Sequence, residues 1–114
     1  MVDLTRPRRS VLFLPASNAR AIEKARGLAC DAVVFDLEDA VAPADKARAR
    51  EQAAAAIAAE GWGGRELVVR VNAVGSAWWE DDLAAAAGAD AVLVPKADAE
   101  SLAVVVGRTE RLVW

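Results

Sequence analysis

An apolar run in the first half of the chain ends in three carboxylate side chains. The run covers residues 32–35, and Asp36, Glu38 and Asp39 follow it. In parallel α/β folds the carboxyl ends of the strands form the face where ligands bind, so acids placed there reach a metal ion, a cation or a proton in transfer. The alternative is that Asp36 and Asp39 cap the turn while Glu38 is solvated.

A basic residue stands at the end of a second apolar run, LVVRV, at residues 67–71. This residue, Arg70, needs an explanation because arginine is rarely buried without a partner. Since neighbouring parallel strands end at one rim, we expect Arg70 and the three acids to converge there. Arg70 then either binds an anionic ligand or forms a structural ion pair with Asp36 or Glu38.

The composition excludes several classes of site. The 114 residues include no histidine and a single cysteine, Cys30, which excludes histidine-based catalytic triads, histidine metal sites and an intramolecular disulfide. The net charge of -3 provides no field that attracts nucleic acid or an anionic membrane. No window approaches the ~20 apolar residues of a membrane span, and a single cysteine suits the cytoplasm. We expect a cytoplasmic protein whose chemistry uses carboxylates, arginine, lysine or a bound metal.

Apolar runs alternate with helix-forming stretches along the chain. The predicted strands are residues 10–14, 32–35, 67–71, 91–94 and 111–114. The predicted helices are residues 19–28, capped by Asn18, and residues 44–59, 80–87 and 101–106. This alternation predicts a parallel sheet, and four strand-helix units in this length match half of the ~250 residues of a TIM barrel. We therefore predict one domain, residues 1–114, that forms the N-terminal half of a TIM (β/α)8 barrel, up to the start of its fifth strand.

Helical spacing also predicts which residues face the core. The expected apolar positions are Ala21, Ile22, Ala25 and Leu28 in the first helix and Ala47, Ala53, Ala54 and Ile57 in the second. Lys46, Arg50 and Glu51 are expected off that face. Pro43 suits the first position of the second helix because its missing N–H would be unpaired there. Residues 1–9 are expected to be a polar lead-in.

Four sequence motifs, taken in order, resemble one enzyme family. They are RSVLFLP at residues 9–15, DAVVFDLEDAVAPADKARAR at 31–50, VVRVN at 68–72 and VLVPK at 92–96. The chain resembles the HpcH/HpaI aldolase superfamily, and within it the branch of citrate lyase beta subunit and malyl-CoA lyase. The resemblance implies a TIM barrel lyase that cleaves or forms a carbon–carbon bond in a (3S)-hydroxyacyl-CoA, such as a malyl-, citramalyl- or citryl-thioester. The reaction would pass through an enolate, with Mg2+ as the cofactor.

The resemblance assigns roles to individual positions. The substrate-binding positions it implies are Arg70, Phe13, Lys24, Asn18 and the weaker candidate Lys96. Arg70 would hold the substrate carboxylate and carbonyl, and would act with Glu38 and Asp39 as the catalytic group. Relatives carry an arginine where this chain has Asn18, so the thioester carrier is either CoA or an acyl-carrier protein.

The metal ligands implied by the resemblance lie beyond Trp114. Within the chain, only Asp36, Glu38 and Asp39 would approach the metal, from outside its ligand shell. We therefore expect the 114-residue chain to be inactive alone, and the full-length protein to be a trimer-like homo-oligomer. The alternative is a non-catalytic module, either a flavodoxin-like domain or a half-barrel that binds a partner. Strand order distinguishes them, because a half-barrel keeps the order of the sequence whereas a doubly wound sheet reverses direction.

Overall fold

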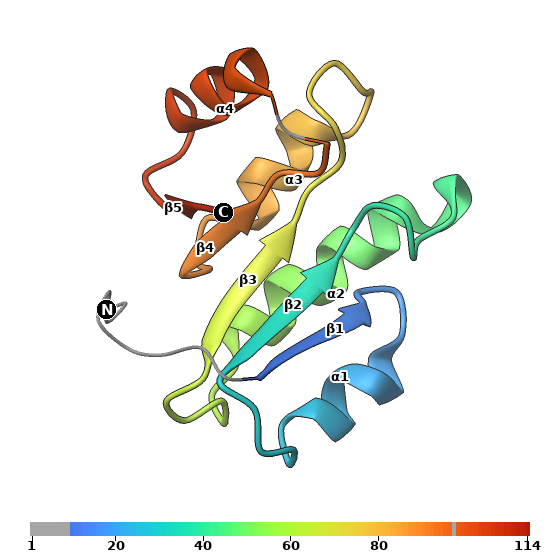
Figure 1. The fold of residues 1–114 in the computed structure, drawn as a ribbon. Coiled ribbons are helices and arrows are strands. Elements are labelled where there is room, and N and C mark those ends of the chain that lie inside the picture. Colours follow the sequence, from blue (N-terminus) through green and yellow to red (C-terminus); the bar gives the residue numbers. More distant parts are fainter. Residues whose placement is uncertain (1–9, 97) are drawn as a thin grey trace.

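The computed structural model describes residues 10–96 and 98–114, and its centre is one parallel sheet of five strands (Figure 1). The strands are β1 (Val11–Pro15), β2 (Ala32–Asp36), β3 (Glu66–Arg70), β4 (Ala91–Leu93) and β5 (Leu112–Val113). Their spatial order follows the sequence, β1-β2-β3-β4-β5, and all neighbours are parallel. The predicted parallel α/β fold is confirmed. The order contains no reversal, so the flavodoxin-like alternative is wrong.

Helices join the strands at the expected places. They are α1 (Ala19–Ala25), the 3-10 turn η1 (Pro43–Asp45) leading into α2 (Lys46–Ala58), α3 (Trp79–Ala85) and α4 (Ala99–Val106). Asn18 caps α1 as predicted, because its Oδ1 accepts a hydrogen bond from the Ala21 backbone N–H at 3.0 Å. Pro43 opens η1 as expected for a residue without an N–H. The predicted lead-in at residues 1–9 lies outside the described residues.

The two faces of the sheet differ in what covers them. On one face, side chains such as Leu14, Phe35 and Val69 form the main core with residues from every helix, including Ile22 of α1 and Val105 of α4. Figure 1 shows α1, α2 and α3 on this side. On the other face, a smaller cluster consists of strand and strand-end residues, namely Val34, Val68 and Ala91 with Leu93, Leu112 and Trp114. Among the described residues the sheet therefore has helices on one face only.

Two predictions of helical facing are wrong. Leu28 lies beyond the end of α1 and is exposed, because the helix ends at Ala25. In α2 the prediction is right for Ala53, which is buried, and for Ile57, which packs against the core, but Ala47 is exposed, and the other buried residues are Lys46, Ala49 and Ala56. The buried face therefore differs in part from the predicted one, and it includes Lys46, which we expected to lie off it. None of the helices among the described residues has the length and apolar character needed to cross a membrane.

Candidate active site

Asp36 and Arg70 form the centre of the candidate site. They are register partners at the ends of β2 and β3. Arg70 Nε donates to Asp36 Oδ1 at 2.9 Å, and Arg70 Nη2 donates to Asp36 Oδ2 at 2.5 Å. The planar guanidinium thus binds both oxygens of one carboxylate. The predicted convergence of Arg70 with the acids is confirmed, and so is the ion pair with Asp36 that was its structural alternative.

Asp36 also caps the turn that follows β2. Its Oδ1 accepts a hydrogen bond from the Glu38 backbone N–H at 2.8 Å, and its Oδ2 accepts one from Ala40 N–H at 3.1 Å. Burial alone would raise the pKa of Asp36, but the hydrogen bonds from Arg70 and from these amides outweigh it and lower that pKa. The interpretation of Asp36 as a turn cap is confirmed, and the ionised carboxylate is the form that the fold stabilises.

This lowered pKa predicts how stability depends on pH. A carboxylate whose pKa is lower in the folded state stabilises the fold above its ordinary pKa, and the contribution is lost as the pH falls through the folded value. We expect Asp36→Asn to lower the free energy of unfolding by about 2 kcal/mol at pH 7. The difference from the wild type should shrink below pH 3.8, the ordinary value for Asp36. Urea unfolding at several pH values measures it, and a difference that stays constant into acid would contradict the role of the charge.

Glu38 lies beside the same arginine. Its Oε1 is 3.8 Å from Arg70 Nε, and its side chain is 11% exposed, so the alternative of a solvated Glu38 is wrong. Burial raises the pKa of Glu38, and the neighbouring Asp39 carboxyl raises it further, while the charges of Arg70 and Lys96 oppose the shift. Asp39 itself is exposed. Glu38 is therefore a carboxyl group with a raised pKa next to the guanidinium of Arg70, and such a raised pKa is typical of groups that transfer protons.

Phe13 forms a wall of the site. It is 51% exposed on β1, and the Arg70 Cζ lies 5.6 Å from the centre of its ring. A hollow of about 330 Å³ lies here, lined by Phe13, Leu14, Pro15, Asp36, Ala40 and Arg70. Among the described residues, the Nη1 group of Arg70 has no hydrogen-bond acceptor, whereas Nε and Nη2 bind Asp36. Arg70 is thus hydrogen-bonded to Asp36, has Glu38 beside it, and keeps its Nη1 group for another anion.

The other predicted binding residues lie around this centre. Lys96 follows β4, is exposed, and adopts a left-handed backbone conformation with φ 48°. Its charge acts on Glu38, so it belongs to the same rim. Asn18 uses its side-chain oxygen to cap α1. Lys24 is exposed on α1, and within the described chain it makes no hydrogen bond or ion pair with Arg70 or the acids.

Sequence reasoning missed a buried polar pair behind the rim. Asn72 follows β3, and its backbone N–H and side-chain Nδ2 donate to Asp82 Oδ2 at 2.9 and 2.7 Å. Burial raises the pKa of Asp82, against the hydrogen bonds from Asn72 and the charge of Arg50. The motif VVRVN includes Asn72, so a polar residue after a strand was the available signal. No comparable signal marked Asp82, because in the sequence it looks like any exposed acid in the first turn of a helix.

The described residues do not form a metal centre. Across residues 10–96 and 98–114, no group of three or more acids, histidines or cysteines is placed to hold a metal ion. Asp36 has both oxygens engaged by Arg70 and by backbone amides. Mg2+ requires a near-octahedral shell of oxygen ligands. These residues therefore do not fit the first shell of a magnesium ion.

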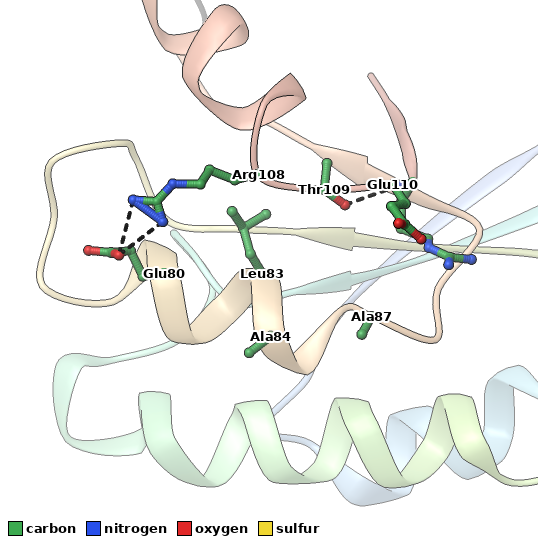
Figure 2. A pocket seen from close by; sticks show the side chains of 8 residues that line it. Glu80, Leu83, Ala84, Ala87, Arg108, Thr109 and Glu110 are labelled. Carbon is green, nitrogen blue, oxygen red and sulfur yellow. Dashed lines mark hydrogen bonds and ion pairs between the residues drawn. The ribbon is translucent and has the colours of Figure 1, made fainter.

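A second hollow lies elsewhere, between α3 and the segment that joins α4 to β5 (Figure 2). Its volume is about 390 Å³, and its lining residues are Glu80, Leu83, Ala84, Ala87, Arg108, Thr109, Glu110 and Arg111. Arg108 and Glu80 are paired across it, with Nη1 and Oε2 3.3 Å apart. None of the predicted site residues lines this hollow, so the rim at Arg70 remains the candidate.

Comparison with known proteins gives matches over nearly the whole chain. A family model described as HpcH/HpaI aldolase/citrate lyase matches residues 9–111. A (3S)-malyl-CoA thioesterase from Cereibacter sphaeroides is 48% identical over 98 residues, which cover 84% of this chain and 34% of the relative. Citrate lyase subunit beta from Escherichia coli K12 is 43% identical over 96 residues, covering 82% of this chain and 32% of the relative.

A solved structure is similar in fold. It is the protein CitE from Mycobacterium tuberculosis in complex with magnesium, acetoacetate and coenzyme A. The TM-score is 0.74 and the identity 38%, and the match covers 94% of this chain and 39% of that one. The chain spans about a third of the length of the curated relatives described above.

Proposed function

Because the chain belongs to the HpcH/HpaI aldolase/citrate lyase family, we propose that it forms part of a magnesium-dependent carbon–carbon lyase acting on a (3S)-hydroxyacyl thioester of coenzyme A. Relatives named for citrate lyase and for a malyl-CoA enzyme support this proposal, as does a similar structure that holds magnesium and coenzyme A. The observation that carries it is Arg70, held by Asp36 and with donors free at a hollow.

The reaction would be a retro-aldol cleavage. In a malyl thioester, the bond between the hydroxyl-bearing carbon and the methylene carbon next to the thioester breaks. The hydroxyl proton leaves, and the electron pair of the broken bond forms the thioester enolate. The enolate takes up a proton to give the acetyl thioester, and the other product is the two-carbon aldehyde acid glyoxylate. This chemistry needs a group that holds the carboxylate and a group that moves the proton.

The rim residues suit these two tasks. Arg70 would bind the carboxylate of the hydroxyacyl group through its Nη1 side, while Asp36 fixes the plane of the guanidinium. Glu38, whose pKa is raised by burial and by Asp39, would accept and return the proton. Phe13 would pack against the thioester, with Lys24, Asn18 and Lys96 further along its path. When bound, magnesium supplies Lewis-acid chemistry, and its ligands on this proposal come from outside the 114 residues.

The same proposal extends to the architecture. The sheet would be the first half of a TIM barrel, up to the start of the fifth strand, because its strand order and one-sided helices match a barrel wall. We propose that the whole protein is a cytoplasmic homo-oligomer, and that CoA rather than an acyl-carrier protein carries the acyl group. Support for CoA comes from the similar structure that contains it.

Thioester hydrolysis is a second candidate function. A relative that is 48% identical is named as a (3S)-malyl-CoA thioesterase. Hydrolysis would add water to the thioester carbonyl and release malate and free CoA, with no carbon–carbon bond broken. The two candidates therefore differ in their products.

A product assay tests the proposal. The whole protein, of which the 114 residues would form part, is purified and incubated with (3S)-malyl-CoA, citramalyl-CoA and citryl-CoA, with Mg2+ and separately with EDTA. We expect at least one thioester to yield a shorter acyl-CoA and a keto or aldehyde acid, and we expect EDTA to stop the reaction. Free CoA thiol without carbon–carbon cleavage would show the hydrolytic alternative. Absence of both products with all three thioesters would contradict the proposed function.

A further inference from the structure

Lys46 is buried at the start of α2 and binds the loop after β2. The residue is 5% exposed. The Nζ donates to three backbone carbonyl oxygens, those of Leu37 at 3.0 Å, Glu38 at 3.0 Å and Val41 at 3.1 Å. An ammonium group has three N–H donors, so each of them has an acceptor. Lys46 also lies over the ring of Trp78, 4.9 Å from its centre.

A lysine in the first turn of a helix is usually exposed, whereas here all three N–H donors of Lys46 are bound to backbone carbonyls. A buried charge is tolerated only where hydrogen bonds replace its water, and a loop carbonyl away from water also needs a donor. Here both requirements are met by the same contacts, because the carbonyls at 37, 38 and 41 surround the ammonium. The loop from Leu37 to Val41 is thus wrapped around Lys46.

A second set of bonds reaches the same loop from β3. Asn72 Nδ2 donates to the Leu37 carbonyl at 2.9 Å, so this oxygen accepts from both Lys46 and Asn72. Asn72 is held by Asp82, whose Oδ1 lies 3.5 Å from Arg50 Nε on α2. Helix α2 therefore contacts the loop directly through Lys46 and indirectly through Asp82 and Asn72.

We propose that Lys46 is a positioning residue, which fixes the backbone of residues 37–41 so that Glu38 faces Arg70. The catalytic consequence rests on the function proposed above, in which Glu38 transfers the proton. The positional claim does not, because it concerns the order of the loop itself. Asp36, itself bound by Arg70, accepts hydrogen bonds from the loop amides of Glu38 and Ala40, and Lys46 donates to the loop carbonyls.

Amide hydrogen exchange tests the positional claim in the purified protein. The amides of Glu38, Ala40 and Val41 are hydrogen-bonded within the loop, so their exchange reports its order. We expect Lys46→Met to speed this exchange about tenfold or more, while amides in the middle of β2 change only with global stability. Lys46→Gln, which keeps fewer donors and no charge, should lie between. The matched control is Arg48→Met, an exposed basic residue of α2 that pairs with Asp45.

Loop exchange equal to the wild type in Lys46→Met or Lys46→Gln would overturn the proposal. If the Met variant fails to fold, the Gln variant decides, because its side-chain amide still donates to the loop carbonyls that methionine leaves without a donor. An increase shared equally by the loop and the β2 core would also overturn it, since that indicates global destabilisation.

The activity assay separates this inference from the proposed function. If the wild type cleaves the thioester, Lys46→Met should lower kcat about tenfold or more with little change in KM, since Glu38 acts on the reacting atoms while Phe13 and Arg70 still bind. An unchanged kcat would overturn the catalytic consequence of the positioning. If the wild type shows no cleavage, the proposed function fails, and loop exchange still decides whether Lys46 positions the loop.

Discussion

In the lyase proposed above, replacing Arg70 with lysine is expected to lower kcat by about 100-fold or more with little loss of stability. Lysine keeps the positive charge but not the planar fork that binds both oxygens of Asp36 and presents further donors. The ammonium group of the lysine would still attract the carboxylate of the proposed substrate, but it would not fix the orientation of that carboxylate. The measurements are kcat and KM for the preferred thioester, together with urea unfolding.

Arg108→Lys is the matched control for this prediction. Arg108 also pairs with a carboxylate, Glu80, but both side chains are exposed and line the second hollow. Its replacement should leave kcat unchanged and shift stability by less than about 1 kcal/mol. Near-normal turnover in Arg70→Lys would show that Arg70 serves as a structural partner of Asp36, which is the alternative that the sequence left open.

The fold was predictable because its signals are local. Continuous apolar runs marked each strand to within one or two residues, and Asn18 and Pro43 marked helix starts through the chemistry of their own backbone. The facing of α2 was not predictable in this way. Lys46 is polar by type, and its burial depends on three carbonyls supplied by a loop that the periodicity of the helix does not include.

The candidate site was predictable in part for a similar reason. Parallel strands bring residues at corresponding ends together, so Asp36 and Arg70 could be paired from their positions alone. The buried residues behind this pair, Asn72 and Asp82, could not be predicted in this way. Asp82 becomes part of the site through the packing of α3 against α2, and nothing in its neighbouring residues distinguishes it from the exposed Asp81. The sequence thus predicts that Arg70 and the acids after β2 meet at the rim, but not which residues hold them there.

A polypeptide limited to residues 1–114 is expected to lack lyase activity and to associate. Its described residues offer no set of acids that fits the first shell of Mg2+, and Asp36 is already engaged by Arg70. Within the described part of the chain, β1 and β5 each pair with a single neighbour. Phe13 and Val11 on β1 are exposed apolar side chains, and unpaired strand edges beside such residues promote association.

Two measurements on this polypeptide test the expected lack of activity and the expected association. Cleavage of malyl-CoA and citramalyl-CoA is followed with and without Mg2+, and sizing chromatography gives the state of association. Because Arg70 and Glu38 would be present without ligands for the metal, we expect turnover at the level of a sample without protein. Phe13→Ser should reduce association, since it removes an exposed apolar ring from the face opposite the helices. Metal-dependent turnover by the 114 residues would show that the chain itself supplies a magnesium site, and a stable monomer would show that its open edges are protected.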